Sequence, residues 1–243
     1  MPVGRMDPAS PMAASAPRAL IVNADDFGQS PGVNRGVATA HERGIVTSAS
    51  LMVRWPAAGP VAAYARAHAS LSLGLHIDLG EWVFRRRRWV PLYEVVPVED
   101  AAAVADEVAR QLTTFWRLVG REPTHIDSHQ HVHQKEPVRT VLLEAASRLG
   151  VPLRGCSPVV RYVGDFYGRT AEGAPLPGHI SVEHLIALLQ ALPTGLTELG
   201  CHPGLGNDLK SVYRSERAKE VHVLCDTRVQ QAVDALGIQL RGF

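Results

Sequence analysis

Histidine and carboxylate side chains gather in one short stretch of this 243-residue chain, residues 124–133. Its metal-ligand types are His125, Asp127, His129, His131 and His133. Alternate side chains of an extended chain point to one face, so this spacing predicts that the imidazoles converge. Imidazole and carboxylate without thiolate suit Zn²⁺, Mn²⁺ or Mg²⁺. One Asp with two His leaves coordination positions for water and substrate, which is typical of a catalytic metal site.

Two adjacent carboxylates, Asp25 and Asp26, follow the apolar residues 19–22. Successive side chains of a strand point to opposite faces, so both reach one site only if the backbone turns between them. Phe27-Gly28 would provide such a turn. The alternative is that one of the two carboxylates simply caps the helix that follows.

Two single histidines accompany other apolar stretches. His76 lies inside residues 73–79, and a lone histidine there is more often a hydrogen-bonded core residue than a ligand. His202 follows residues 196–201 and precedes Pro203-Gly204, a turn that would hold it at the end of a strand. Neither histidine indicates a site unless partners lie nearby in the fold.

The elements that must position these side chains follow from the apolar pattern. We expect strands at residues 19–22, 48–53, 72–79, 124–128, 151–154, 196–201 and 238–240. We expect helices at 30–43, 60–68, 137–149, 181–192, 215–224 and 227–236, and one more that begins at Glu99 or Asp100 and ends at about Val119. Residues 80–100 and 155–178 are predicted to be long loops. Alternating strands and helices predict βαβ units and a parallel α/β sheet, and about seven units favour a closed or nearly closed barrel. Functional groups collect at the carboxyl ends of such strands.

Composition narrows the class of protein. A hydrophobic content of 46% with 20% charged residues is globular, and 25 basic against 24 acidic residues give no overall field that would attract nucleic acid or an anionic membrane. The three cysteines are widely spaced, which argues for a reducing, cytoplasmic location and against a thiolate zinc site. No apolar run is long enough for a transmembrane segment. We expect residues 1–17 to be a disordered leader and residues 18–243 a single domain.

The run Arg85 to Arg88 stands apart from these patterns. Four consecutive arginines are most often the solvated face of a loop. Because Trp82 and Trp89 flank the run, it could also form a rim that binds a sugar or an anionic head group.

Taken together, five motifs resemble the YdjC family of carbohydrate deacetylases, which includes chitooligosaccharide deacetylases and hopanoid-associated members. The matching motifs are Val22-Asn-Ala-Asp-Asp-Phe-Gly28, Gly44-Ile-Val-Thr-Ser48, Gly74-Leu-His76, Thr124-His-Ile-Asp-Ser-His-Gln-His-Val-His133 and His202-Pro-Gly204. Their order and spacing make the resemblance specific to the family, although not to a substrate.

The resemblance implies a distorted (β/α) barrel of TIM type, complete or incomplete, that removes the acetyl group from an N-acetylated sugar. It implies a divalent metal, Mg²⁺ or Zn²⁺, bound by Asp26, His76 and His129, with Asp25 as general base and His202 as general acid. The residues then expected to support these groups or to bind substrate are Asn23, Asp127, His131, His133 and Arg154. The implied substrate is an oligosaccharide or glycolipid containing N-acetylglucosamine, and the implied assembly is a homodimer.

Two other classes of function are compatible with the same residue types. A metal-dependent phosphoesterase or amidohydrolase also uses His and Asp clusters at barrel strand ends, but no carboxylates for a second metal and no HxH on the first strand are visible. A non-catalytic protein that binds sugar or stores metal is the other alternative. Release of phosphate from generic esters would favour the former, and tight metal binding without turnover the latter.

Overall fold

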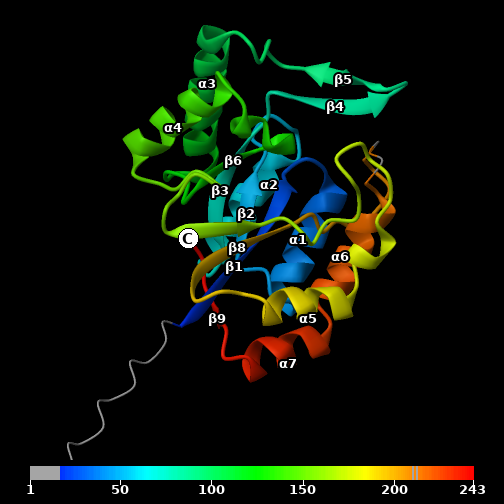
Figure 1. The fold of residues 1–243 in the computed structure, drawn as a ribbon. Helices are drawn as coiled ribbons and strands as arrows, with labels where there is room; N and C mark the ends of the chain where they lie inside the picture. Colours follow the sequence, from blue (N-terminus) through cyan, green and yellow to red (C-terminus); the bar gives the residue numbers. More distant parts are fainter. Residues whose placement is uncertain (1–16, 210, 212) are drawn as a thin grey trace, which may run out of the picture.

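A parallel sheet of seven strands occupies the centre of the computed structural model, which describes residues 17–209, 211 and 213–243 (Figure 1). Its strands are β1 (Arg18–Phe27), β2 (Ser48–Leu51), β3 (Ser72–Ile77), β6 (Ile126–Ser128), β7 (Val160–Val163), β8 (Gly195–Cys201) and β9 (Gln239–Leu240). Every residue of β1 after the first is buried, as expected for a central strand of the sheet. The helices are α1 (Pro31–Arg43), α2 (Ala58–Ala67), α3 (Ala101–Val119), α4 (Val138–Leu149), α5 (Val182–Gln190), α6 (Ser215–Leu224) and α7 (Thr227–Ala235).

The strand order is β6-β3-β2-β1-β8-β7, with β9 paired to the start of β1. The path has two ends, so the sheet is a curled half-barrel rather than a complete TIM barrel. The prediction of a single-domain α/β fold with a parallel sheet is confirmed, and a closed barrel is not what the strands form. Beyond β6, the predicted strand at 151–154 contributes only a bridge from Leu153 to Ile126.

The ends of α1 and α3 lie where the sequence predicts them. Ser30 caps α1 by accepting a hydrogen bond from the backbone N–H of Val33, and Gly44 ends that helix. Asp100 caps α3, with Oδ1 accepting from the N–H groups of Ala102 (3.0 Å) and Ala103 (3.1 Å). These contacts satisfy backbone donors that have no partner within the helix.

Replacing Asp100 with alanine is expected to lower the free energy of unfolding by about 1 kcal/mol, because the two capped N–H groups lose their acceptor. Denaturant unfolding followed by circular dichroism measures this change. Asp106→Ala removes a carboxylate from an exposed position within the same helix and serves as the control. Equal stability of the two variants would contradict the capping role.

The predicted loop at residues 80–100 is wrong: the structure has an antiparallel hairpin of β4 (Gly80–Arg85) and β5 (Arg88–Glu94). Its strands alternate aromatic and aliphatic residues, which fit a pleated ribbon. The turn between them uses Arg86 and Arg87 at φ 49° and 63°, where Asn and Gly are the usual residues, so the turn lacked its sequence signal. The predicted loop at 155–178 likewise contains β7.

The predicted leader, residues 1–17, lies outside the described residues except for Pro17. The carbonyl of Pro17 accepts a hydrogen bond from the backbone N–H of Gly195 at the start of β8 (3.1 Å). Within the described part of the chain, no helix combines the length and the hydropathy needed to cross a bilayer.

Candidate metal and catalytic site

Asp25 and Asp26 both face the site because β1 bulges at its end. Asp26 has φ 64°, in the left-handed region that aspartate tolerates better than most residues. The β1–β2 register also shifts between Ala24 and Phe27, so β1 has one more residue than β2 there. The turn that brings the two carboxylates together therefore lies at Asp26 itself, one residue before the predicted Phe27-Gly28.

His76 joins two carboxylates at the end of β3. Its Nδ1 lies 2.7 Å from Oδ1 of Asp127, its register partner on β6, and its Nε2 lies 3.3 Å from Oδ1 of Asp26. Asp127 thus fixes the orientation of the ring and leaves Nε2 directed at Asp26. Burial lowers the pKa of His76, but Asp127 and Asp26 outweigh burial and hold it well above its usual range.

His129 completes the cluster, although not from an extended strand. Its Nδ1 lies 3.0 Å from Oδ1 of Asp26. The predicted alternation of imidazoles along residues 125–133 is wrong, because the strand ends at Ser128 and 3₁₀ turns follow (η1, His129–Gln134). Gln130 and His131 have positive φ within these turns, so the histidines point in different directions. Burial lowers the pKa of His129, yet Asp26 outweighs it and raises the pKa to about 9.

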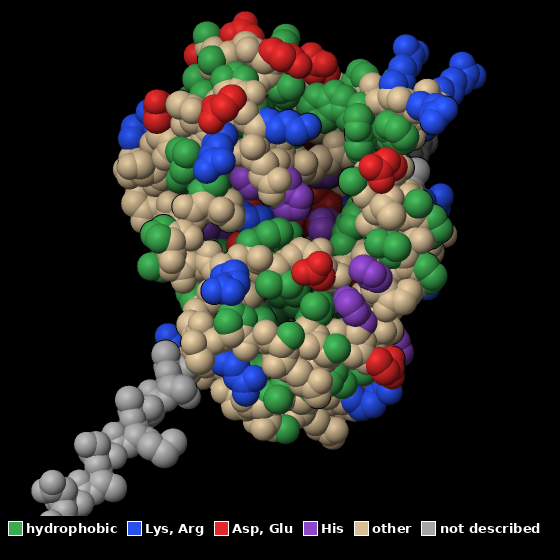
Figure 2. All heavy atoms as spheres, viewed as in Figure 1, with side chains coloured by type: hydrophobic (Ala, Val, Ile, Leu, Met, Phe, Trp, Pro, Cys, Tyr) green, Lys and Arg blue, Asp and Glu red, His purple; other side chains and the backbone are tan. Residues whose placement is uncertain are grey.

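The donor atoms of Asp26, His76 and His129 all lie within 4.8 Å of one another, as a metal site requires. Both ring nitrogens of His76 face carboxylate oxygens, which only accept hydrogen bonds, whereas a neutral imidazole has one N–H. The second nitrogen therefore needs either an extra proton or a cation between it and Asp26. One carboxylate and two imidazoles fit a divalent metal with open positions. Figure 2 shows histidine and acidic side chains at the floor of a hollow in this face.

A second group of potential ligands, Asp25, His76 and Asp127, already contains a cation. Nη2 of Arg154 lies 2.7 Å from Oδ1 of Asp25 and 2.5 Å from Oδ2 of Asp127. The guanidinium thus occupies the space between these carboxylates. The first group is for this reason the better candidate for a metal.

Asp25 is held as an ionised carboxylate next to the three candidate metal ligands. Arg154 donates to both its oxygens (2.7 Å each), and Asn23 Nδ2 donates to Oδ1 (2.9 Å). Burial raises the pKa of Asp25, but Arg154 outweighs burial and lowers it. Oδ2 lies 3.7 Å from Nε2 of His202. The two residues predicted as base and acid are therefore neighbours.

His202 lies just after β8, and contacts with neighbouring residues fix both its backbone and its ring. Its N–H donates to the buried carboxylate of Glu220 on α6, and its ring packs on Tyr167 and Tyr213 (centroids 5.1 and 5.8 Å apart). Burial lowers the pKa of His202 to about 4, so the imidazole is neutral at physiological pH. Its Nδ1 has no hydrogen-bond partner among the described atoms.

Arg217 of α6 connects the candidate metal ligand Asp26 with the loop after β8. Its Nη2 lies 2.5 Å from Oδ2 of Asp26, and its Nη1 donates to the carbonyl of His202 (3.3 Å). Burial raises the pKa of Asp26, but Arg217 and His129 outweigh burial and hold it well below its usual range. Arg217 leaves Oδ1 of Asp26 free to face the two imidazoles.

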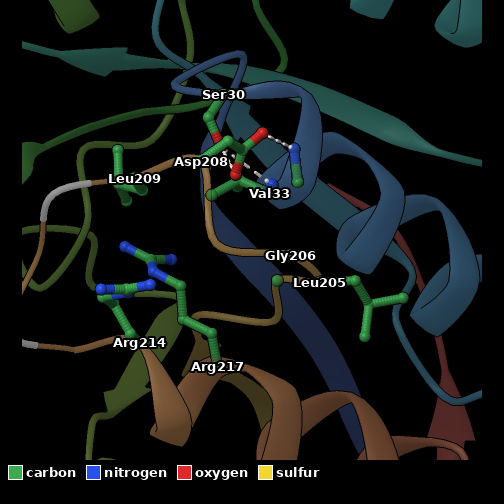
Figure 3. Close-up of a pocket in the computed structure, with 10 residues that line it drawn as sticks. Ser30, Val33, Leu205, Gly206, Asp208, Leu209, Arg214 and Arg217 are labelled. Atoms are coloured by element: carbon green, nitrogen blue, oxygen red, sulfur yellow. Dashed lines mark hydrogen bonds between the residues drawn. The ribbon is translucent and has the colours of Figure 1, made fainter.

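A small pocket lies on the other side of Arg217, between α6 and the start of α1 (Figure 3). Asp208 closes it by accepting hydrogen bonds from the N–H of Gly32 (2.7 Å) and the hydroxyl of Ser30 (3.2 Å). Gly32 has no room for a Cβ, which would lie 2.2 Å from the carbonyl oxygen of Leu205. The loop after β8 is thus packed tightly on α1, which fixes the position of His202.

The remaining predicted residues surround the cluster rather than join it. Asn23 and Arg154 hold Asp25, and Asp127 holds His76. His133 Nδ1 bonds the hydroxyl of Ser128 (2.6 Å), and His131 Nε2 lies 3.4 Å from the hydroxyl of Tyr162. His125, in the same stretch, bonds Ser50 and Thr124 and stacks on Phe243 (3.9 Å), as a core histidine would.

Sequence reasoning missed three charged residues that organise the site: Arg217, Glu220 and Glu198. Glu198 accepts from Nε of Arg154 (2.7 Å), and burial raises its pKa to about 7. A carboxylate inside the apolar stretch 196–201 was a signal that could have identified it. Arg217 and Glu220 lie on an ordinary polar helix, and only the fold brings them to the site.

Comparison with known proteins agrees with the motifs. A carbohydrate deacetylase from Geobacillus stearothermophilus is 33% identical over 245 residues, which cover 92% of this chain and 96% of that protein. A chitooligosaccharide deacetylase from Serratia marcescens is 31% identical over 260 residues, which cover 92% of this chain and 97% of that protein.

Solved structures share the fold. A protein from Enterococcus faecalis V583, described as a cellobiose-phosphate cleavage protein, superposes with a TM-score of 0.77 at 26% identity, covering 93% of this chain and 98% of its own. A family 4 carbohydrate esterase from Streptomyces lividans gives a TM-score of 0.56 at 13% identity, covering 93% of each chain. Residues 19–235 match the family model described as YdjC-like protein, which confirms the resemblance of the motifs, and the chain therefore belongs to the YdjC-like family.

Proposed function

We propose that this chain is a metal-dependent carbohydrate deacetylase that hydrolyses the acetamide group of an N-acetylated sugar to acetate and a free amine. The observation that carries the proposal is the arrangement of Asp26, His76 and His129 around one point, with Asp25 and His202 beside it. The relatives named as deacetylases support the same reaction.

Asp26, His76 and His129 would hold the cation. A bound divalent ion supplies polarisation of the amide carbonyl and a lower pKa for the attacking water. Asp127 keeps Nε2 of His76 directed at Asp26, and Arg217 keeps Oδ1 of Asp26 directed at both histidines. These two contacts preorganise the ligand set before substrate arrives.

The protons are moved by Asp25 and His202. Asp25 removes one proton from the water whose oxygen attacks the carbonyl carbon. Its Oδ2 accepts one hydrogen bond from Arg154, keeps one lone pair for this proton and lies 3.7 Å from Nε2 of His202. His202 is neutral at rest, so the proton it gives to the departing nitrogen comes from Asp25, 3.7 Å away. The C–N bond then breaks, and the second proton of the water passes from the new carboxyl group to the amine or to solvent, which leaves acetate and the amine.

The proposed substrates are oligosaccharides or glycolipids that contain N-acetylglucosamine. Acetate release from a panel of such compounds, including lipid-linked ones, tests the proposal and ranks the substrates. Release of one acetate per amine formed is the expected result. Phosphate release from generic esters without acetate release would instead indicate a phosphoesterase. The homodimer and the cytoplasmic location stay predictions.

A further inference from the structure

The β4–β5 hairpin carries an unusual concentration of charge at residues 82–93, which we call the hairpin tip. The hairpin tip contains four of the 25 basic residues of the chain and none of its 24 acidic residues. Arg85, Arg86, Arg87 and Arg88 are all exposed. The overall charge of +1 therefore conceals a strongly basic local surface, which projects from the body of the molecule (Figures 1 and 2).

Large apolar side chains are exposed on the same segment. Phe84, Trp89 and Leu92 are 37%, 52% and 44% exposed, and they make up three of the seven large hydrophobic residues exposed in the described part of the chain. Phe84 and Trp89 are cross-strand partners with ring centroids 5.5 Å apart. Clustered exposed apolar side chains indicate an interaction surface, whereas scattered ones need no explanation.

The hairpin geometry places positive charge on the face opposite the two aromatic rings and at the turn. Cross-strand partners share a face, so Phe84 and Trp89 lie on one face and Arg85 and Arg88 on the other. Arg86 and Arg87 form the turn at the end. The hairpin tip is therefore a narrow two-stranded ribbon in which a pair of aromatic rings is adjacent to a pair of guanidinium groups.

We propose that the hairpin tip docks on an anionic lipid bilayer, with Phe84, Trp89 and Leu92 in the interface and the arginines on lipid phosphates. Tryptophan beside arginine is the combination that favours the membrane interface, and each basic residue near an anionic surface adds to binding. A single-stranded nucleic acid would stack on the aromatic rings but would gain little from Leu92 and Pro91. The boundary between head groups and acyl chains of a bilayer can accommodate the aromatic rings as well as Leu92 and Pro91. The docking does not depend on the reaction proposed above.

The test is flotation of the full chain with vesicles of phosphatidylcholine alone or mixed with phosphatidylglycerol. Binding to the mixed vesicles only, lost at high salt, is the expected result. The variant R86N/R87G removes two charges but introduces the residue pair that this turn prefers, so we expect the hairpin to fold as before. It is expected to bind about 25-fold more weakly, at about fivefold per arginine. Trp89→Ser is also expected to weaken binding.

Two control variants match the test variants in chemistry. R139A/R148A removes two exposed arginines from α4, and Trp116→Ser removes a tryptophan that is 55% exposed on α3. Both are expected to bind vesicles as the unchanged protein does. The proposal is overturned if the unchanged protein fails to float with the mixed vesicles, if R86N/R87G binds like the controls, or if the tip binds a single-stranded oligonucleotide but not vesicles.

Discussion

Replacing Asp25 with asparagine is expected to lower the rate of acetate release by about 10²- to 10⁴-fold, the usual contribution of a general base. The amide cannot take the proton from water, although it has the size and shape of the carboxylate that lies between Arg154 and His202. Metal content should not change, because Asp25 is not among the three proposed ligands. Steady-state kinetics with an N-acetylated oligosaccharide and elemental analysis of the same sample measure both quantities.

Asp234→Asn provides the control for this substitution, since Asp234 is exposed on α7, away from the site. It is expected to leave the rate unchanged. A thermal melt of Asp25→Asn separates catalysis from folding, because the new amide loses a charged partner for the buried Arg154. Full activity of a folded, metal-loaded Asp25→Asn protein would show that the base is another group.

Removal of the metal by a chelator is expected to abolish acetate release, and readdition of a divalent cation to restore it. Replacing His129 with glutamine should weaken metal affinity by at least about 100-fold, since even loss of a residue that only supports a ligand costs 10- to 100-fold. Equilibrium dialysis followed by elemental analysis measures the affinity.

His222→Gln is the matched control, because His222 is exposed on α6. Its metal affinity should equal that of the unchanged protein. If the chelated protein released acetate at the full rate, or if His129→Gln bound metal normally, the three-residue site would be wrong.

Sequence pattern predicted that side chains near the carboxyl ends of the buried strands share one edge of the sheet, and Asp26 and His76 lie near the ends of β1 and β3. That the two residues act as ligands of one metal was implied by the family resemblance alone. Sequence pattern failed where the backbone leaves regular structure. The strand before His129 stops at Ser128, and Gln130 and His131 then adopt left-handed conformations that glycine or asparagine would have signalled.

Contacts between segments far apart in the chain also could not be predicted from the sequence pattern. Arg217 reaches Asp26 across 191 positions, and Arg154 reaches Asp25 across 129. Nothing local in α6 distinguishes Arg217 from an exposed helical arginine. Both pairings depend on the tertiary fold, which brings these segments together.

Gln130 joins the hairpin to the proposed ligand set. Its side-chain amide donates to the carbonyl of Trp82 and accepts from the N–H of the same residue, both at 2.8 Å, and it directly follows His129 in the chain. Glu81 on β4 also lies 3.9 Å from Nε2 of His129. A shift of Trp82 would therefore be expected to move Gln130 and, with it, the neighbouring His129, which is one of the three proposed metal ligands.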